Sequence, residues 1–243
     1  MDIKVRVILL VIIAIFVVHA ISLNFTQDDA FISYRYVGNF INGHGLVFNP
    51  GERVEGYTNF LWIILLSIFA KFGLDIIVVS KILGIGSGCV TLFLLYKISA
   101  LFFQKKKRLT GPTKEGASSP QDWFFALFPS LLLASNSAFA YWSISGLETV
   151  FFLMAILLSV YFYLLIFNSI NQRLMMLFGA LSTLIRPEGV LIFVILMLHK
   201  LFFKKDKLKD CLLSLAGFIA LLLPFLIFKI IYYGDILPNS FYA

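Results

Sequence analysis

The feature that most constrains this chain is a series of long apolar segments that recur along almost its whole length. The first covers residues 5–23 and, at about 1.5 Å of helix rise per residue, is long enough to cross a hydrocarbon core of about 30 Å. Further apolar segments lie at residues 76–103, 123–141, 150–167, 174–185, 190–203 and 211–232. Because a backbone surrounded by lipid must satisfy its own hydrogen bonds, these segments predict transmembrane α-helices.

Composition excludes a soluble globular protein. Of the 243 residues, 60% are hydrophobic and 14% are charged, whereas soluble domains contain about 25% charged residues. The net charge of +7 comes from Lys and Arg at the ends of apolar segments, which is typical of cytoplasmic loops and not of nucleic-acid binding. Cys89 and Cys211 lie in or beside apolar segments and indicate neither a disulfide framework nor a metal site.

Basic residues beside the apolar segments indicate how the chain is oriented. Lys4 and Arg6 flank the first segment and place the N-terminus in the cytoplasm, where loops carry an excess of Lys and Arg. The same rule places the basic cluster at residues 105–108 inside. A single crossing at 76–103 then joins this cluster to residues 24–57 outside. We therefore expect an all-α, polytopic transmembrane helical bundle of about seven spans in the inner (plasma) membrane.

This topology leaves the apolar residues 57–73 at the outer interface, as a helix with Tyr57 and Trp62 at headgroup depth. The alternative is two true spans before the basic cluster, which would then lie outside. Residues 5–23 can also be read as a signal peptide, but their apolar core is longer than the usual length of about 7–15 residues, which favours an uncleaved anchor.

Two further segments have local signatures. Residues 104–122 are rich in Gly, Pro, Ser and Lys and are expected to form a flexible cytoplasmic loop. Gly84 and Gly88 form a small-xxx-small pattern, which predicts close contact between helices.

Sorting residues by side of the membrane places many charged side chains on the outer face. Because charges near the membrane centre are costly, such residues tend to gather around a water-filled cavity. The outer residues are Asp28, Asp29, Arg35, His44, Glu52, Arg53, Glu55, Glu148, Arg186, Glu188 and Asp235. We therefore expect an outer-face pocket to which several loops contribute.

Asp28 and Asp29 open the first outer loop. If the chain continues as a helix, Asp28 shares one face with Ile32 and Arg35. Repulsion between two neighbouring carboxylates tends to raise one pKa, which suits one of them to proton abstraction. The alternative is that these residues cap a helix that begins near residue 30.

Other outer residues have side chains suited to a phosphorylated sugar. Arg can bind a phosphate with two hydrogen bonds, and carboxylates and amides can hold sugar hydroxyls. A surface turn with a local ion pair remains the alternative for residues 49–59. The candidate substrate-binding residues are Arg35, Tyr36, Glu52, Arg53, Glu55, Tyr57, Asn59, Glu148, Arg186 and Glu188. No carboxylate cluster has clear metal-ligand spacing, and no nucleotide-binding glycine loop is present.

Four blocks together resemble a bacterial branch of the GT-C superfamily, whose members are polytopic glycosyltransferases that use polyprenyl-phosphate sugars. They are residues 28–62 (DDAFISYRYVGNFINGHGLVFNPGERVEGYTNFLW), 145–149 (SGLET), 186–189 (RPEG) and 232–243 (YYGDILPNSFYA). Within the superfamily the chain resembles the mycobacterial terminal arabinofuranosyltransferases. Protein O-mannosyltransferases and aminoarabinose transferases are more distant, and the resemblance extends through nearly the whole chain.

The resemblance implies an inverting sugar transfer on the periplasmic or outer face, to a cell-envelope glycan or glycolipid acceptor. It implies that an Asp of the first outer loop, here Asp28 or Asp29, is the general base. Basic residues near the membrane neutralise the leaving phosphate, and Arg35, Arg53 and Arg186 are candidates on chemical grounds. No dedicated cofactor is expected, although a divalent cation on the donor phosphate is compatible with this chemistry.

Relatives of this kind are typically longer, so we expect residues 1–243 to be a single membrane module that corresponds to their N-terminal membrane portion. Two other functions remain open. A transporter or flippase of a lipid-linked sugar predicts polar residues through the middle of the spans, and those are scarce here. The third hypothesis is a non-catalytic fragment that binds the lipid donor.

Overall fold

The computed structural model describes residues 3–110, 120–165, 169–203, 208–235 and 238–239. Over these residues the chain forms ten α-helices and no strand, which confirms the all-α class. The helices are α1 (Ile3–Leu23), α2 (Ala30–Ile41), α3 (Phe60–Lys71), α4 (Ile76–Thr110), α5 (Pro120–Ala134), α6 (Ser137–Ile144), α7 (Thr149–Leu164), α8 (Ser169–Ile185), α9 (Gly189–Phe202) and α10 (Leu208–Tyr233).

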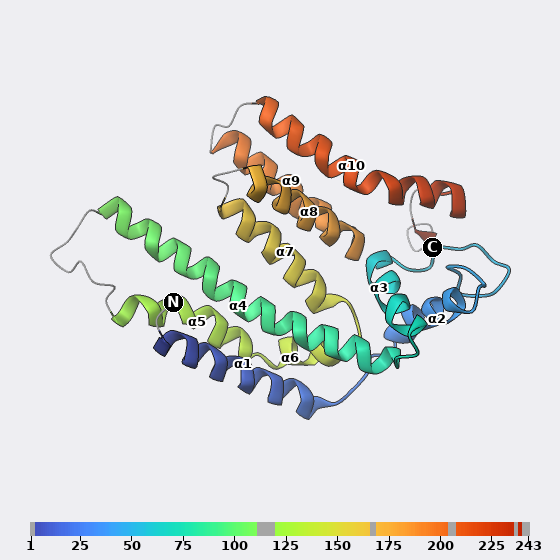
Figure 1. The fold of residues 1–243 in the computed structure, drawn as a ribbon, viewed down its shortest axis with the longest axis horizontal. Coiled ribbons are helices and arrows are strands. Elements are labelled where there is room, and N and C mark those ends of the chain that lie inside the picture. The colour runs from blue at the N-terminus through green and yellow to red at the C-terminus, as the bar shows by residue number, and fades with distance from the viewer. Residues whose placement is uncertain (1–2, 111–119, 166–168, 204–207, 236–237, 240–243) are drawn as a thin grey trace.

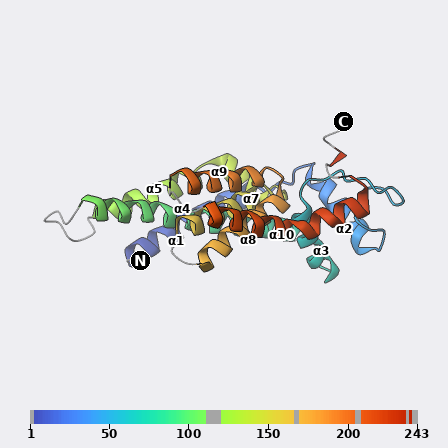
Figure 2. The same cartoon turned by 90° about the horizontal axis from the view of Figure 1, so that it is seen from above.

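The longer helices lie side by side, and successive ones run in opposite directions along the long axis of the molecule (Figure 1). Helices α2 and α3 lie at one end, together with the C-terminal end of α10, while the N-terminus lies toward the other end. Seen from above, the molecule is much longer than it is thick (Figure 2). We call the end that carries α2 and α3 the outer end, after the orientation predicted from the basic residues.

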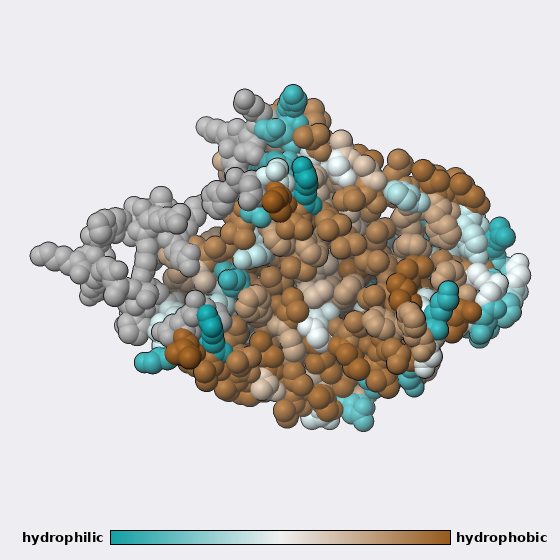
Figure 3. All heavy atoms as spheres, viewed as in Figure 1, coloured by the Kyte–Doolittle hydropathy of each residue, from teal (hydrophilic) through white to brown (hydrophobic). Residues whose placement is uncertain are grey.

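Several of these helices are suited to a membrane. Within the described residues, α1, α4 and α10 are each long and apolar enough to cross a bilayer, and α5 with α6 makes a fourth candidate if the bent pair is one span. Apolar side chains cover the middle of the visible face, and hydrophilic ones gather toward its ends (Figure 3). The structure thus supports three or four spans by length and composition, and the predicted seven crossings stay a prediction.

The apolar segment predicted at residues 123–141 is broken rather than continuous. Helix α5 ends at Ala134, and α6 leaves it at an angle of 61°. The break occurs because Asn136 caps α6: its side chain accepts a hydrogen bond from the backbone N–H of Phe139 at 3.0 Å.

The loop expected at residues 104–122 is shorter than predicted. Helix α4 continues to Thr110 and α5 begins at Pro120, so both ends of the expected loop are helical, and residues 111–119 lie outside the described residues. Helix α4 therefore continues past the end of its apolar segment at residue 103 and includes the basic residues 105–108.

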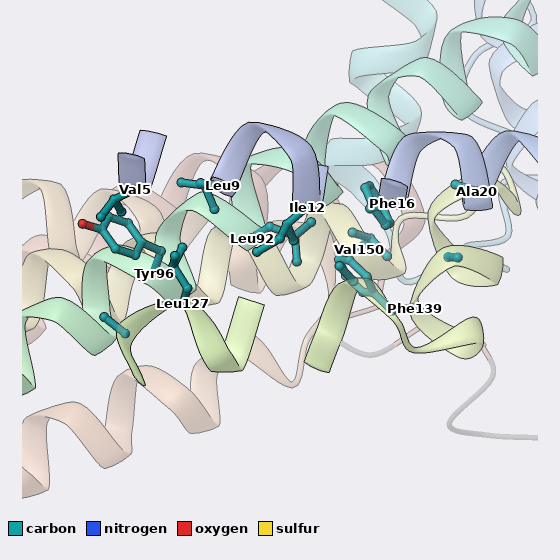
Figure 4. Packing of buried hydrophobic residues seen from close by; sticks show 13 residues of the cluster. Val5, Leu9, Ile12, Phe16, Ala20, Leu92, Tyr96, Leu127, Phe139 and Val150 are labelled. Carbon is teal, nitrogen blue, oxygen red and sulfur yellow. The ribbon is translucent and has the colours of Figure 1, made fainter. Parts of the chain in front are cut away.

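A buried stripe on α1 joins it to the neighbouring helices. Val5, Leu9, Ile12, Phe16 and Ala20 are buried and recur every three or four residues, so they form one face of α1. This face packs against a second set of buried residues, which are Leu92, Tyr96, Leu127, Phe139 and Val150 (Figure 4). The contact anchors α1 to α4–α7 and fixes where the first outer loop begins.

The two glycines of the small-xxx-small pattern lie at close helix contacts, as predicted. A Cβ at Gly84 would lie 2.2 Å from the Ser143 carbonyl oxygen, and one at Gly88 would lie 2.3 Å from the Phe16 ring. Any larger residue would push α4 away from α1 and α6.

Helix α3 agrees with the predicted interfacial helix at residues 57–73. Its 12 residues give a length of about 18 Å, too short to cross the hydrocarbon core. Its N-terminal part is buried at Trp62 and Ile63, whereas Ile68 and the following Phe72 are exposed. Helices α2 and α3 therefore form an outer layer on the bundle.

Candidate functional site

The two predicted catalytic aspartates lie immediately before α2. The helix begins at Ala30, and Asp29 occupies its N-cap position, but the side chain of Asp29 makes no capping hydrogen bond. Both Asp28 and Asp29 are exposed. In the described part of the chain, neither carboxylate has a hydrogen-bond or ion-pair partner. Both carboxylates are therefore available to a ligand.

Asp28 lines a cavity of about 450 Å³ at the surface of α2. The other lining residues are Phe31, Ile32, Tyr34, Arg35 and Phe48. The sequence spacing predicted that Asp28, Ile32 and Arg35 share one helix face, and all three line this cavity. We call this cavity the Asp28 groove.

Arg35 is held in place within the Asp28 groove. Its Nε donates a hydrogen bond to the Phe48 carbonyl oxygen at 2.8 Å, and its Nη2 donates one to Asn49 Oδ1 at 3.2 Å. The guanidinium also lies 4.6 Å from the centre of the Phe48 ring. A positive charge and a carboxylate thus face one cavity with apolar and aromatic walls.

A second group of predicted residues surrounds Arg186. Its Nη1 lies 3.7 Å from Glu148 Oε1, and its Nε lies 3.7 Å from Glu188 Oε2. Glu148 also accepts a hydrogen bond of 2.8 Å from Asn59 Nδ2. The Glu148 side chain is buried, whereas that of Arg186 is 35% exposed. We call these four residues the Arg186 cluster.

Local sequence explains how the Arg186 cluster forms. Glu148 precedes α7 and Glu188 precedes α9, but neither side chain caps the helix that it precedes, and both lie beside Arg186. Gly146 has φ +87°, and a Cβ there would lie 2.2 Å from the Tyr34 hydroxyl. Only glycine fits at this position, because it allows both the backbone conformation and the close approach of α2.

A continuous set of contacts connects the Arg186 cluster with the start of α2. Asn59 Nδ2 also donates a hydrogen bond to Ser33 Oγ on α2 at 2.9 Å. Ser145, three residues before Glu148, contacts the residue that precedes Asp28. Its carbonyl oxygen accepts a hydrogen bond of 2.9 Å from the backbone N–H of Gln27. The segments that carry both groups therefore meet at the same end of the molecule, but no residue of the Arg186 cluster lines the Asp28 groove, so the predicted common pocket stays a prediction.

Three other candidate ligands lie in the loop that joins α2 to α3 or contact it from α2. Glu52 accepts a hydrogen bond from Asn49 Nδ2 at 3.1 Å, and Arg53 lies over the Tyr232 ring at 4.9 Å. The Tyr36 hydroxyl donates to the Val54 carbonyl oxygen at 3.0 Å. These contacts stabilise the loop, and roles for the three residues in substrate binding stay predictions.

The most buried ion pair among the described residues joins the loop between α2 and α3 to α10, and the sequence did not predict it. Lys229 lies within the last apolar segment. Its Nζ lies 2.7 Å from Glu55 Oε2, and the two side chains are 6% and 4% exposed. A lysine within an apolar segment was the available signal, since such a charge requires a partner.

Burial also changes the pKa of two residues in this loop, Glu55 and Tyr57. Desolvation raises the pKa of the Glu55 carboxyl, and the Lys229 ammonium opposes that change. Desolvation raises the pKa of Tyr57 well above its ordinary value, and the adjacent Tyr233 hydroxyl, 3.0 Å away, adds to the effect. Both candidate ligands therefore lie in a buried, low-dielectric part of the outer layer.

Among the described residues, no group of three or more His, Cys, Asp or Glu side chains is arranged to hold a metal ion. The Asp28 groove contains one carboxylate, Asp28, and one cation, Arg35. Any divalent cation on the donor phosphate stays a prediction.

Comparisons of the chain with protein-family models, with curated proteins and with solved structures find no match.

Proposed function

We propose that this chain is an inverting membrane glycosyltransferase, which transfers a sugar from a polyprenyl-phosphate donor to a cell-envelope acceptor on the outer face. The observation that carries the proposal is the Asp28 groove, in which an unpaired carboxylate and a fixed guanidinium face one cavity. The groove lies in the outer layer, next to helices suited to a bilayer. The resemblance of residues 28–62 and three other blocks to GT-C enzymes supports the same function.

Asp28 is the general base in this proposal. The acceptor hydroxyl oxygen attacks the anomeric carbon from the face opposite the phosphate, which inverts the configuration. As the new C–O bond forms, the hydroxyl proton passes to a carboxylate oxygen of Asp28. We assign the base to Asp28 and not to Asp29 because Asp28 lines the cavity and Asp29 does not.

The leaving phosphate requires a positive charge. When the bond from the anomeric carbon to the phosphate oxygen breaks, the polyprenyl phosphate leaves with an additional negative charge. Arg35 is placed for this role in the groove, and Arg186 has a partly exposed guanidinium whose two carboxylate contacts are long at 3.7 Å. A guanidinium can bind two phosphate oxygens at once, which makes both residues suitable donors.

The distribution of carboxylates favours a transferase over a transporter. A transport path predicts charged side chains along the spans. Every carboxylate whose side chain the structure describes instead lies in a loop, at an N-cap or in the first turn of a helix: Asp28, Asp29, Glu52, Glu55, Asp75, Glu148, Glu188, Asp210 and Asp235. Most of them lie at the outer end, where the proposed reaction takes place.

The proposal is tested with purified protein in detergent or nanodiscs, incubated with a panel of polyprenyl-phosphate sugars and assayed for donor consumption. Wild type should consume at least one donor. Asp28→Asn should lower turnover by about 10²–10⁴-fold, the usual range for a general base, with donor affinity retained. Asp29→Asn is the matched control and should keep most of the activity.

Two outcomes would contradict the proposal. In the first, wild type leaves all donors intact, while a polyprenyl-phosphate-dependent glycosyltransferase of known activity consumes its donor under the same conditions. Alternatively, wild type consumes a donor and Asp28→Asn does so at the same rate. Donor binding without consumption by wild type would favour the non-catalytic binding fragment.

A further inference from the structure

The loop between α2 and α3 is attached to the end of α10 by the Glu55–Lys229 ion pair. Glu55 belongs to this loop, and Lys229 lies in the last two turns of α10. Their 2.7 Å contact is almost fully removed from solvent. A buried charge without its partner is strongly unfavourable, so the two segments are held together as long as both charges are present.

Three further contacts join the same two segments. The Tyr233 hydroxyl lies 3.0 Å from the Tyr57 hydroxyl and donates to the Leu46 carbonyl oxygen at 2.7 Å. Beyond α10, the backbone N–H of Asn239 donates to the Glu55 carbonyl oxygen at 2.9 Å. The end of α10 and the residues that follow it therefore contact the loop near its start, at Leu46, and near its end, at Glu55 and Tyr57.

Gly45 shows how closely α10 approaches the loop. It has φ +86°, and a Cβ there would lie 2.2 Å from the Tyr232 hydroxyl oxygen. Any other residue would strain the backbone and displace Tyr232.

The other side of the loop forms a wall of the Asp28 groove. Phe48 lines the groove, and its carbonyl oxygen accepts hydrogen bonds from Arg35 Nε and from Asn39 Nδ2, both at 2.8 Å. Asn49 accepts a further bond from Arg35. The position of the groove's cation thus depends on the position of the loop, which in turn is attached to α10.

We propose that Glu55 and Lys229 are positioning residues of the Asp28 groove: their ion pair clamps residues 44–58 onto α10 and so places Phe48 and Arg35 for the ligand. Neither residue has to touch the ligand for this role. The identity of the ligand as a polyprenyl-phosphate sugar rests on the proposed function, whereas the clamp does not.

A positioning role and a purely structural role predict different kinetics. Asp28 does not depend on the clamp for its own place at the start of α2, whereas Arg35 does. Glu55→Gln should therefore raise the donor KM by about 10-fold and also lower kcat, because Arg35 binds the donor phosphate and stabilises the charge that develops on it as it leaves. A purely structural role would lower the active fraction, and hence kcat, at unchanged KM.

The test compares Glu55→Gln, Lys229→Gln and the charge swap Glu55→Lys/Lys229→Glu in full-length protein. Amide hydrogen exchange of residues 44–58 should be about 10-fold faster in each single variant and close to wild type in the swap. Leu92→Ala is the matched control, because it creates a cavity in the α1–α4 core far from the loop in sequence and lowers stability without changing the loop. It should leave exchange of residues 44–58 unchanged relative to the rest of the chain.

A reporter in the groove wall makes the result independent of turnover. The emission of the Phe48→Trp protein should shift to the red when Glu55→Gln is added. It should return toward the value of Phe48→Trp alone when the charge swap is added instead. Unchanged exchange in both single variants overturns the clamp. Faster exchange with unchanged Phe48→Trp emission overturns the positioning role. If wild type consumes no donor, the proposed function fails, and these two measurements still decide the inference.

Discussion

The outer layer contains two groups of charged side chains that differ in how completely their charges are paired. Glu55 and Lys229 are 2.7 Å apart, and both side chains are almost fully buried. In the Arg186 cluster, the two Arg186–carboxylate distances are both 3.7 Å, and Arg186 and Glu188 are 35% and 58% exposed. Both groups join segments that are distant in sequence, but only the second presents a charge to solvent.

This difference indicates which group can bind a ligand. A short, buried pair has no exposed surface for a third partner, and removal of either charge leaves the other uncompensated. A partly exposed arginine with long contacts to both carboxylates can bind a phosphate without first losing a strong bond. We therefore expect loss of the Glu55–Lys229 pair to affect mainly stability and the position of the Asp28 groove, and loss of Arg186 to affect mainly turnover.

The largest effect should come from Lys229→Met. It leaves the Glu55 carboxylate buried without its partner, and the free energy of unfolding should fall by about 3–5 kcal/mol. Thermal unfolding in detergent measures the change, with Lys71→Met on the exposed end of α3 as control. The double variant Glu55→Met/Lys229→Met should recover much of the loss, because two apolar side chains can replace a buried pair. Equal melting temperatures for Lys229→Met and Lys71→Met would contradict this assignment.

Arg186→Ala should show the opposite behaviour. Turnover should fall by about 10²–10³-fold, as when one donor to a developing negative charge is removed. The free energy of unfolding should fall by about 1–2 kcal/mol, less than for Lys229→Met, because Glu148 is buried but Arg186 is partly exposed and its carboxylate contacts are long. Donor consumption and thermal unfolding are measured on the same preparation, with Arg173→Ala, an exposed arginine of α8, as control. A large loss of stability with normal turnover would reverse the assignment of the two groups.

Asn59 tests the buried half of the Arg186 cluster. Asn59→Leu removes the 2.8 Å hydrogen bond to Glu148 and leaves a largely buried carboxylate without that donor. The expected loss is about 1–3 kcal/mol, the cost of an unsatisfied buried polar group. Ser33→Ala removes the other bond made by Asn59 and should cost less, about 0.5–1.5 kcal/mol. If Ser33→Ala destabilises the protein more than Asn59→Leu, the network is organised around α2 and not around Glu148.

The parts of this structure that follow local patterns were predictable from the sequence. The apolar segments became helices, and α2 continued from Asp29 with Asp28, Ile32 and Arg35 along one cavity. Both results depend on the helical repeat, which is a property of neighbouring residues. Charge sorting by side also placed Glu148 and Arg186 in the same layer, because membrane topology restricts where charged loops can lie.

The contacts that depend on distant residues were not predictable. Nothing near Glu55 in the sequence indicates that its partner is Lys229, because the pair forms only when α10 packs against the first outer loop. The break between α5 and α6 was missed for a different reason. The apolar character of residues 123–141 continues through it, and the single polar residue Asn136 ends one helix and caps the next.

The smallest effect concerns the phenols around the Glu55–Lys229 pair. Burial raises the pKa of Tyr57 and of Tyr36 above the ordinary value of about 10. A group whose pKa is raised by folding contributes stability that is complete below its unfolded pKa and is lost as the pH rises above it. Wild type should therefore lose stability above about pH 10, and the loss should be smaller in Tyr57→Phe.

At neutral pH, Tyr57→Phe should cost only about 0.5–1.5 kcal/mol, the value of its hydroxyl contact with Tyr233. Melting temperatures from pH 7 to pH 11 measure both effects, and Tyr141→Phe is the control because its hydroxyl donates to Gln27 away from the pair. If Tyr57→Phe and wild type lose stability in parallel above pH 10, then Tyr57 is not buried against α10. The contrast between the buried Glu55–Lys229 pair and the partly exposed Arg186 cluster would then depend on Glu55 and Lys229 alone.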